Sequence, residues 1–357
     1  MDRKALEFLK NIFDCASPSG FEQKIQGIVR ERLEGEVDEI RTDVHGNVIA
    51  VQNPDAPLRV MIAGHCDEIG LMVTHIDEKG YLYFTPMAWW DPIVLGGQWV
   101  EIHNERGVVP GVIPRKAIHH QEEEDYTKFP KTKLDSDFWI DIGANSKEDA
   151  LKAVAIGDTI TICRKFRKLR NNLFTARGID DRAGTWVMAE TMRRIRKMKL
   201  RCAVYGVSTV QEEIGMRGAQ TSAFDIDAHV GIVAEIGCAS DSPKMDKRVT
   251  GECEVGKGPI MFRGANINPK LAQIMERTAK REQIKFQVQP LVFPLTSGTD
   301  AFVMQVSRAG MATTIVGIPT RYAHSSVEVA SLKDLDRAVA LIVATLGELK
   351  PGIDFTP

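Results

Sequence analysis

Apolar residues recur every three or four positions in several parts of the chain. Near residues 6–13, for example, leucine, isoleucine and phenylalanine alternate with charged residues at helical spacing. The last helix has Ser331 in the N-cap position, where a serine oxygen can accept a backbone hydrogen bond. The pattern predicts helices over residues 2–15, 21–33, 180–199, 268–281 and 331–349.

Almost unbroken apolar runs lie between these helices. Runs of this kind are typical of strands buried on both faces, in sheets that carry helices on both sides. We therefore expect an α/β domain. Its predicted strands cover residues 44–52, 59–65, 200–210, 229–237 and 312–319.

The middle of the chain has a different pattern. Short segments of alternating apolar and polar residues are separated there by glycine, proline and charged turns, which predicts a small all-β module such as a barrel. The simplest architecture is an α/β domain over residues 1–66 and 164–357, interrupted by a β module over residues 67–163.

Composition excludes several classes of protein. The 357 residues include 46 lysines and arginines and 48 aspartates and glutamates, and this balance does not fit a nucleic-acid binder that relies on basic charge. Membrane spans need about 18 consecutive apolar residues, and no window of the sequence reaches that length. The six cysteines form no CxxC pair, and the first residues do not resemble a signal peptide, so we expect a cytoplasmic protein.

Acidic residues and histidines occur where the predicted strands end and where a helix begins. In open α/β sheets, ligands bind beyond the carboxyl ends of the strands, so these side chains are expected to converge. Clustered carboxylates repel one another and become tolerable with cations between them. The candidate residues are His65, Asp67, Asp180, Asp181, Glu212, Glu213, Glu235 and His324.

Imidazole and carboxylate ligands together suit zinc, cobalt, manganese or nickel. Five ligands exceed the three that a single catalytic zinc takes, and they fit a pair of ions that share one carboxylate. In the adjacent pair Glu212 and Glu213, one carboxylate could bind metal while the other takes a proton from water. Asp67 is well placed to orient the His65 ring.

Each of these residues has a simpler explanation when it is taken alone. Asp180 and Asp181 could be N-caps of the following helix, and Glu212 and Glu213 could be an exposed acidic pair. The metal-site hypothesis depends on their joint placement along the chain.

Five motifs in fixed order closely resemble the tetrahedral (TET) aminopeptidases, a family of co-catalytic metallopeptidases also called glutamyl or deblocking aminopeptidases. The resemblance covers nearly the whole chain, including VLGGQWVEI and FWIDIGANSKEDA in the predicted β module. The five motifs are GHCDEIG, GIDDRAG, QEEIGMRGA, SGTDA and IPTRYAHSSVE.

This resemblance implies a phosphorylase/hydrolase-like, three-layer α/β/α catalytic domain with an inserted β-barrel dimerisation domain. It also implies a hollow tetrahedral dodecamer built from dimers, peptide substrates, and two divalent ions per chain, with zinc or cobalt favoured. One ion would be held by His65, Asp180 and Glu235, and the other by Asp180, Glu213 and His324.

In the same resemblance, Glu212 would be the general base and then the acid toward the leaving amine, with Asp67 orienting His65. The chain departs from the family pattern at Glu235, where aspartate is usual, and at Cys66, where methionine or threonine is often found.

Three other functions are consistent with part of this pattern. A related di-metal deacylase of N-acyl amino acids would use the same kind of metal site. A non-catalytic family member is a second alternative, which Glu235 alone favours. Some relatives carry an endoglucanase label, but a glycosidase needs two carboxylates on opposite sides of a sugar bond and not a cluster with histidines.

Overall fold

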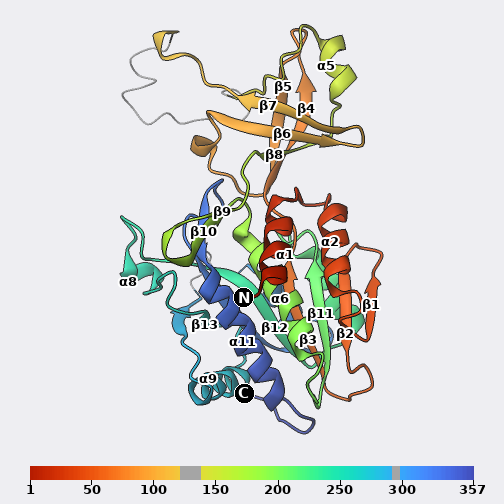
Figure 1. Cartoon of the computed structure of the whole chain (residues 1–357), viewed down its shortest axis with the longest axis vertical. Coiled ribbons are helices and arrows are strands. Elements are labelled where there is room, and N and C mark those ends of the chain that lie inside the picture. Colours follow the sequence, from red (N-terminus) through yellow and green to blue (C-terminus); the bar gives the residue numbers. More distant parts are fainter. Residues whose placement is uncertain (121–137, 292–297) are drawn as a thin grey trace. The chain divides into compact units, whose positions relative to one another are not determined.

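The structure, a computed structural model, describes residues 1–120, 138–291 and 298–357 (Figure 1). Its contacts divide the chain into two compact units. The first contains Met1–Glu68, Lys165–Ala323 and Val327–Pro357, and the second contains Ile69–Arg164 and His324–Ser326.

An eight-stranded mixed sheet forms the centre of the first unit, in the order β1-β2-β11-β3-β12-β15-β13-β14. The four neighbouring strands β11, β3, β12 and β15 are parallel to one another, as the near-continuous apolar runs predict. The strands are β1 (Glu39–Thr42), β2 (Val48–Gln52), β3 (Arg59–His65), β11 (Ala203–Thr209), β12 (Val230–Cys238), β13 (Ile260–Arg263), β14 (Gln287–Pro290) and β15 (Ala312–Thr320).

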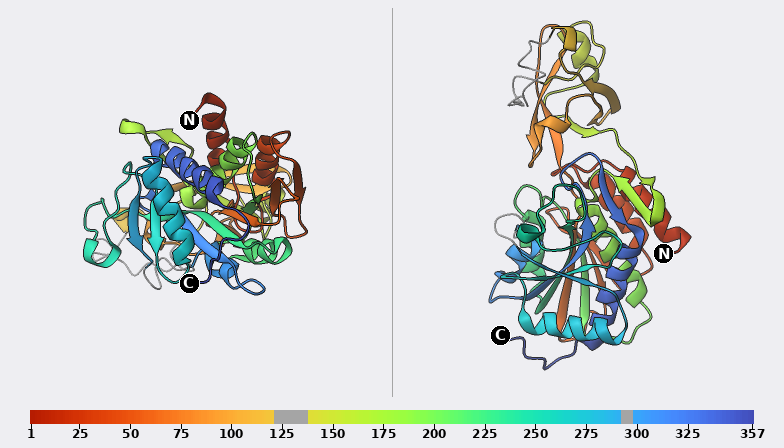
Figure 2. Two further views of the ribbon diagram at one scale, coloured as in Figure 1. Left: turned by 90° about the horizontal axis from the view of Figure 1, so that it is seen from below. Right: turned by 90° about the vertical axis from the view of Figure 1, so that its left-hand side faces the viewer.

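Helices cover both faces of this sheet, which gives three layers. Figure 2 shows α1, α6 and α11 together on one side of the strands. Side chains alternate along β3, with Val60 and Ile62 in the core on the α6 side and Met61 and Ala63 in the core on the α7 side. The helices of the first side are α1 (Arg3–Asp14), α2 (Gln23–Leu33), α6 (Ile179–Ile195), α9 (Pro269–Arg281) and α11 (Leu332–Glu348), and those of the second are α7 (Arg217–Ile226) and α10 (Asp300–Gln305).

Smaller elements complete the first unit. A three-stranded sheet has the order β16-β10-β9. Its strands are β16 (Glu328–Ser331), β10 (Leu173–Ala176) and β9 (Arg167–Lys168), and two short helices, η3 (Arg170–Asn172) and α8 (Lys247–Thr250), lie outside both sheets.

The second unit has a five-stranded antiparallel sheet in the order β5-β4-β8-β6-β7. Residues 140 and 141 form isolated bridges with Leu82 of β5 and Val112 of β7. The elements are β4 (Gly70–Ile76), β5 (Leu82–Met87), β6 (Gln98–Asn104), β7 (Gly107–Ile113), β8 (Thr159–Ile162), α5 (Lys147–Ala153), η1 (Pro92–Val94) and η2 (Ile118–His120). Among the described residues, no helix is long and apolar enough to cross a bilayer.

Two glycines allow α6 to pack directly on the sheet. A Cβ atom on Gly64 of β3 would lie 2.4 Å from the carbonyl carbon of Gly184, and one on Gly184 would lie 2.1 Å from the carbonyl oxygen of Ala234 in β12. Contacts this close leave no space for a side chain at either position. The packing places the first turn of α6, with Asp180 and Asp181, beside the carboxyl end of β3.

Candidate metal and catalytic site

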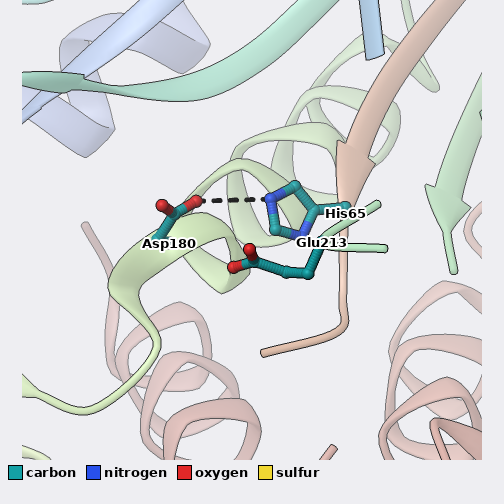
Figure 3. A group of neighbouring side chains, drawn as sticks. All are labelled: His65, Asp180 and Glu213. Carbon is teal, nitrogen blue, oxygen red and sulfur yellow. Dashed lines mark ion pairs between the residues drawn. The ribbon is translucent and has the colours of Figure 1, made fainter. Parts of the chain in front are cut away.

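His65, the last residue of β3, lies at the centre of a buried acidic cluster and is 1% exposed. Its Nε2 atom lies 3.3 Å from Asp180 Oδ1, 3.7 Å from Glu212 Oε2 and 3.9 Å from Glu235 Oε2. Figure 3 shows the His65 ring facing the carboxylate of Asp180, with Glu213 beside it. The structure therefore brings together side chains from β3, α6, β12 and the turn that follows β11.

Two overlapping groups of side chains lie close enough together to hold a metal ion. One consists of His65, Asp180 and Glu213, and the other of His65, Asp181 and Glu235. In each group, one potential ligand atom per residue lies within 4.8 Å of the others. One imidazole with several carboxylates is a donor set suited to zinc and related divalent ions.

Asp67 contacts the opposite edge of the His65 ring. Asp67 Oδ1 lies 3.3 Å from His65 Nδ1, and the Asp67 carbonyl oxygen lies 3.2 Å from the same nitrogen. The Asp67 carboxylate also accepts hydrogen bonds from the backbone nitrogens of Glu212 and Glu213, at 3.0 and 3.2 Å. One buried carboxylate thus contacts both the histidine and the acidic turn.

Burial is the main cause of the altered protonation in this cluster. Burial, reinforced by neighbouring negative charges, raises the pKa of Glu212, Glu213 and Glu235 well above the usual range. Burial alone would lower the pKa of His65, but the charge of Glu212 and the hydrogen bonds with Asp180 and Asp67 raise it overall. Carboxylates crowded in this way favour the approach of a cation, because a cation removes their mutual repulsion.

Asp181, a candidate site residue with an N-cap as its simpler explanation, accepts two hydrogen bonds from backbone nitrogens. Its Oδ1 accepts from the Gly184 nitrogen at 2.9 Å, and its Oδ2 accepts from the His65 nitrogen at 3.3 Å. The N-cap interpretation therefore describes part of what Asp181 does. The Asp180 carboxylate, by contrast, faces the His65 imidazole.

Glu235 does not end its strand, in contrast to the predicted pattern of site residues at strand ends. It lies inside β12, which continues to Cys238. The β3–β12 pairing ends at Ala63 and Val233, and the same register extended by two residues sets His65 opposite Glu235. Glu235 therefore lies level with the carboxyl end of β3, although its own strand continues further.

His324 belongs to neither ligand group among the described residues. Its backbone is grouped with the second unit, and its Nδ1 atom lies 3.0 Å from the carbonyl oxygen of Trp89. Its expected role as a ligand stays a prediction.

Two acidic residues that support the site had no role assigned from the sequence. Asp300, in the motif SGTDA, is buried and accepts a hydrogen bond from Thr209 Oγ1 at 2.6 Å, while its Oδ1 has no hydrogen-bond partner among the described residues. Burial raises the pKa of Asp300 to about 6. Glu328 accepts hydrogen bonds from the backbone nitrogens of Ile179 and Asp180 and so fixes the start of α6. The motifs IPTRYAHSSVE and SGTDA contained both residues.

A buried ion-pair network lies behind the cluster. Glu68 Oε2 is 2.9 Å from Arg182 Nη2 and 3.0 Å from Arg177 Nε, and all three side chains are buried. Cys66, between His65 and Asp67, packs in the apolar core, where burial raises the pKa of its thiol. The thiol therefore stays protonated and is not prepared for metal binding.

Comparison with known proteins agrees with these observations. The family model of the M42 glutamyl aminopeptidases matches residues 46–341. A lysyl aminopeptidase of Pyrococcus furiosus is 40% identical over 354 residues, which cover 98% of this chain and 99% of that protein.

Two solved structures have the same fold over almost their whole length. A TET aminopeptidase from a marine sediment archaeon of the Thaumarchaeota has a TM-score of 0.92 and 34% identity, covering 98% of both chains. The TET1 peptidase of Pyrococcus horikoshii, described as assembling into a tetrahedron or a large octahedral shell, has a TM-score of 0.85 and 30% identity, covering 97% of this chain and 100% of that one. The chain belongs to the M42 glutamyl aminopeptidase family and is an aminopeptidase, a hydrolase of peptide bonds.

Proposed function

We propose that this aminopeptidase removes N-terminal residues from peptides with two divalent cations, and that Glu212 is its general base. The observation that carries the proposal is the buried cluster in which Asp180, Glu212 and Glu235 all lie within 4 Å of His65 Nε2, at 3.3, 3.7 and 3.9 Å. A chain of this length can bury a large enough core without so costly a set of charges.

The two groups of ligand atoms have only His65 in common, and the group with Glu235 contains Asp181. For the metal-loaded enzyme we propose that the two cations share the carboxylate of Asp180. Asp180 is proposed as the bridge because its Oδ1 lies 3.3 Å from His65 Nε2 and because it belongs to the same ligand group as Glu213. In this proposal, zinc or cobalt is favoured, with manganese or nickel also compatible with the donors. One cation would be held by His65, Asp180 and Glu235, and the other by Asp180, Glu213 and His324.

Bound divalent cations would polarise the scissile carbonyl and make a water molecule more acidic. Glu212 would accept a proton from that water and then donate it to the leaving amine. The Glu212 carboxylate lies 3.7 Å from His65 Nε2, close enough to the ligand groups to take a proton from that water. Asp67 would hold the His65 ring through Nδ1, as carboxylates do for metal-bound histidines.

The same proposal includes assembly and location. We propose that the second unit is a β-barrel, closed by the bridges of residues 140 and 141, and that it joins chains into dimers. The shells described for the TET1 relative support a homo-oligomer, for which we propose the tetrahedral dodecamer. The six free cysteines fit a cytoplasmic location.

The test compares Glu212→Gln with the wild type on an aminoacyl anilide and on an N-acetyl amino acid. We expect the wild type to cleave the anilide, and the variant to lose about 100- to 10,000-fold in kcat, the range for a general base. Metal content, measured by mass spectrometry, should be the same in both proteins. Near-full turnover by the variant would overturn the role of Glu212, and preference for the N-acetyl substrate would favour a deacylase.

A further inference from the structure

Two buried carboxylates hold the turn that carries Glu212 and Glu213. The backbone nitrogen of Gln211 donates to Glu22 Oε1 at 3.1 Å. The next two nitrogens donate to Asp67, that of Glu212 to Oδ1 at 3.0 Å and that of Glu213 to Oδ2 at 3.2 Å. Three consecutive backbone N–H groups are thus held by side chains from distant parts of the chain.

The turn needs these bonds because it lies outside the sheet and outside any helix. β11 ends at Thr209, α7 begins at Arg217, and Gln211 has a left-handed backbone with φ of 55°. Buried N–H groups without partners are costly, and hydrogen bonds to a carboxylate are stronger than those to a neutral acceptor. The carboxylates therefore help to fix the turn, and with it the Glu212 side chain, together with the backbone hydrogen bonds within residues 210–218.

Glu22 is itself firmly placed. Its side chain is 4% exposed, and its Oε1 also accepts from the Gly20 nitrogen at 2.7 Å. Nearby, Ser19 donates to Asp67 Oδ2 at 2.7 Å. Residues 19–22 therefore supply one of the two carboxylates that hold the turn and contact the other. Burial and the charge of Asp67 raise the pKa of Glu22 to about 7.

We propose that Glu22 is a positioning residue for the general base, acting through the backbone nitrogen of Gln211. The inference rests on the proposed role of Glu212. Glu22 does not contact the reacting atoms in this account. It fixes the turn from one end while Asp67 fixes it from the other.

The experiment compares Glu22→Ala with Glu22→Gln, which keeps an acceptor oxygen at the same place. Displacing a catalytic group by about 1 Å costs on the order of 100-fold, so we expect kcat of Glu22→Ala to fall about 10- to 100-fold. Because the turn also carries Glu213, the assays are run at saturating metal; KM should then stay at the wild-type value, and kcat of Glu22→Gln should largely recover. Hydrogen exchange measured by mass spectrometry should become faster in the peptide that contains Gln211.

Asp334 provides a matched control. It is a buried carboxylate that accepts from the backbone nitrogens of Gly256 and Gly258, and it has no part in the cluster around His65. Asp334→Ala should lower the free energy of unfolding while kcat stays at the wild-type value.

Wild-type kcat in Glu22→Ala would overturn the inference, as would a loss of kcat that follows an equal loss of metal. Equal impairment of Glu22→Gln and Glu22→Ala would overturn it too, because the acceptor oxygen would then be irrelevant. Any of these outcomes would overturn the role of Glu22 alone, provided that Glu212→Gln is inactive while it binds metal normally. A fully active Glu212→Gln would instead overturn the proposed function, and the role of Glu22 with it.

Discussion

Asp67 Oδ1 lies 3.3 Å from His65 Nδ1 and also accepts a hydrogen bond from the backbone nitrogen of Glu212 at 3.0 Å. The same atom therefore sets the orientation of the imidazole and the place of the acidic turn. Its own environment keeps it ionised. Burial alone would raise the pKa of Asp67, but the hydrogen bond and charge of His65 outweigh burial and lower it.

Replacing Asp67 with asparagine should damage both functions of this contact. The amide can accept only at one of its two ends, so the backbone nitrogen of either Glu212 or Glu213 loses its acceptor. Removing a residue that supports a metal ligand typically costs about 10- to 100-fold in metal affinity or activity. Zinc titration and steady-state kinetics measure the two effects. Unchanged affinity together with unchanged kcat would contradict the role assigned to Asp67.

Gly184→Ala should disrupt the site through packing alone. The new Cβ atom would lie 2.1 Å from the carbonyl oxygen of Ala234 and 2.2 Å from Asp181 Oδ2. Forced overpacking of this kind costs about 1–3 kcal/mol or more, and the shift of α6 should also weaken metal binding. Urea unfolding and metal titration check both expectations.

Gly27→Ala is the matched control for that substitution. Gly27 lies inside α2, and no heavy atom lies within 4 Å of the place where its Cβ would be. Alanine in an open helical position should stabilise the protein by about 0.5–1 kcal/mol. Equal stability of the two variants would show that the contact of α6 with β3 and β12 leaves room for a Cβ atom at residue 184.

Glu68→Gln should destabilise the protein strongly. It would remove the buried carboxylate that pairs with both Arg177 and Arg182, and breaking a buried ion pair costs about 3–5 kcal/mol. Glu36→Gln breaks a partly exposed pair with Arg196 at 3.0 Å, for which about 0–1 kcal/mol is expected. The comparison uses urea unfolding of both metal-loaded variants. A cost for Glu68→Gln no greater than that for Glu36→Gln would show that the network contributes little.

Much of the fold could be predicted from local patterns. The apolar run over residues 59–65 coincides with β3, and Ser331 caps α11 by accepting from the Lys333 nitrogen. α7 and the edge strand β1 were not predicted. β1 has an exposed, charged sequence, EIRT, and α7 has small polar residues on its outer side, so neither shows a strong apolar pattern.

The residues of the site could be predicted where they lie near the carboxyl ends of strands or at the start of a helix. His65, Asp180, Glu212, Glu213 and Glu235 do converge in the structure. Asp300 and Glu22 could not be assigned, because their importance depends on contacts with residues far away in the chain, Thr209 and Gln211. Sequence spacing carries no information about such pairings.

The measurement that tests the account most directly is the number of cations bound per chain. Protein freed of metal with a chelator is dialysed against increasing zinc or cobalt, and metal content and anilide cleavage are followed together. The account predicts two ions per chain at saturation, with activity returning as the sites fill, and fewer in a double variant of Asp180 and Glu235 to alanine. Saturation below two ions per chain, or full activity in the metal-free protein, would contradict it.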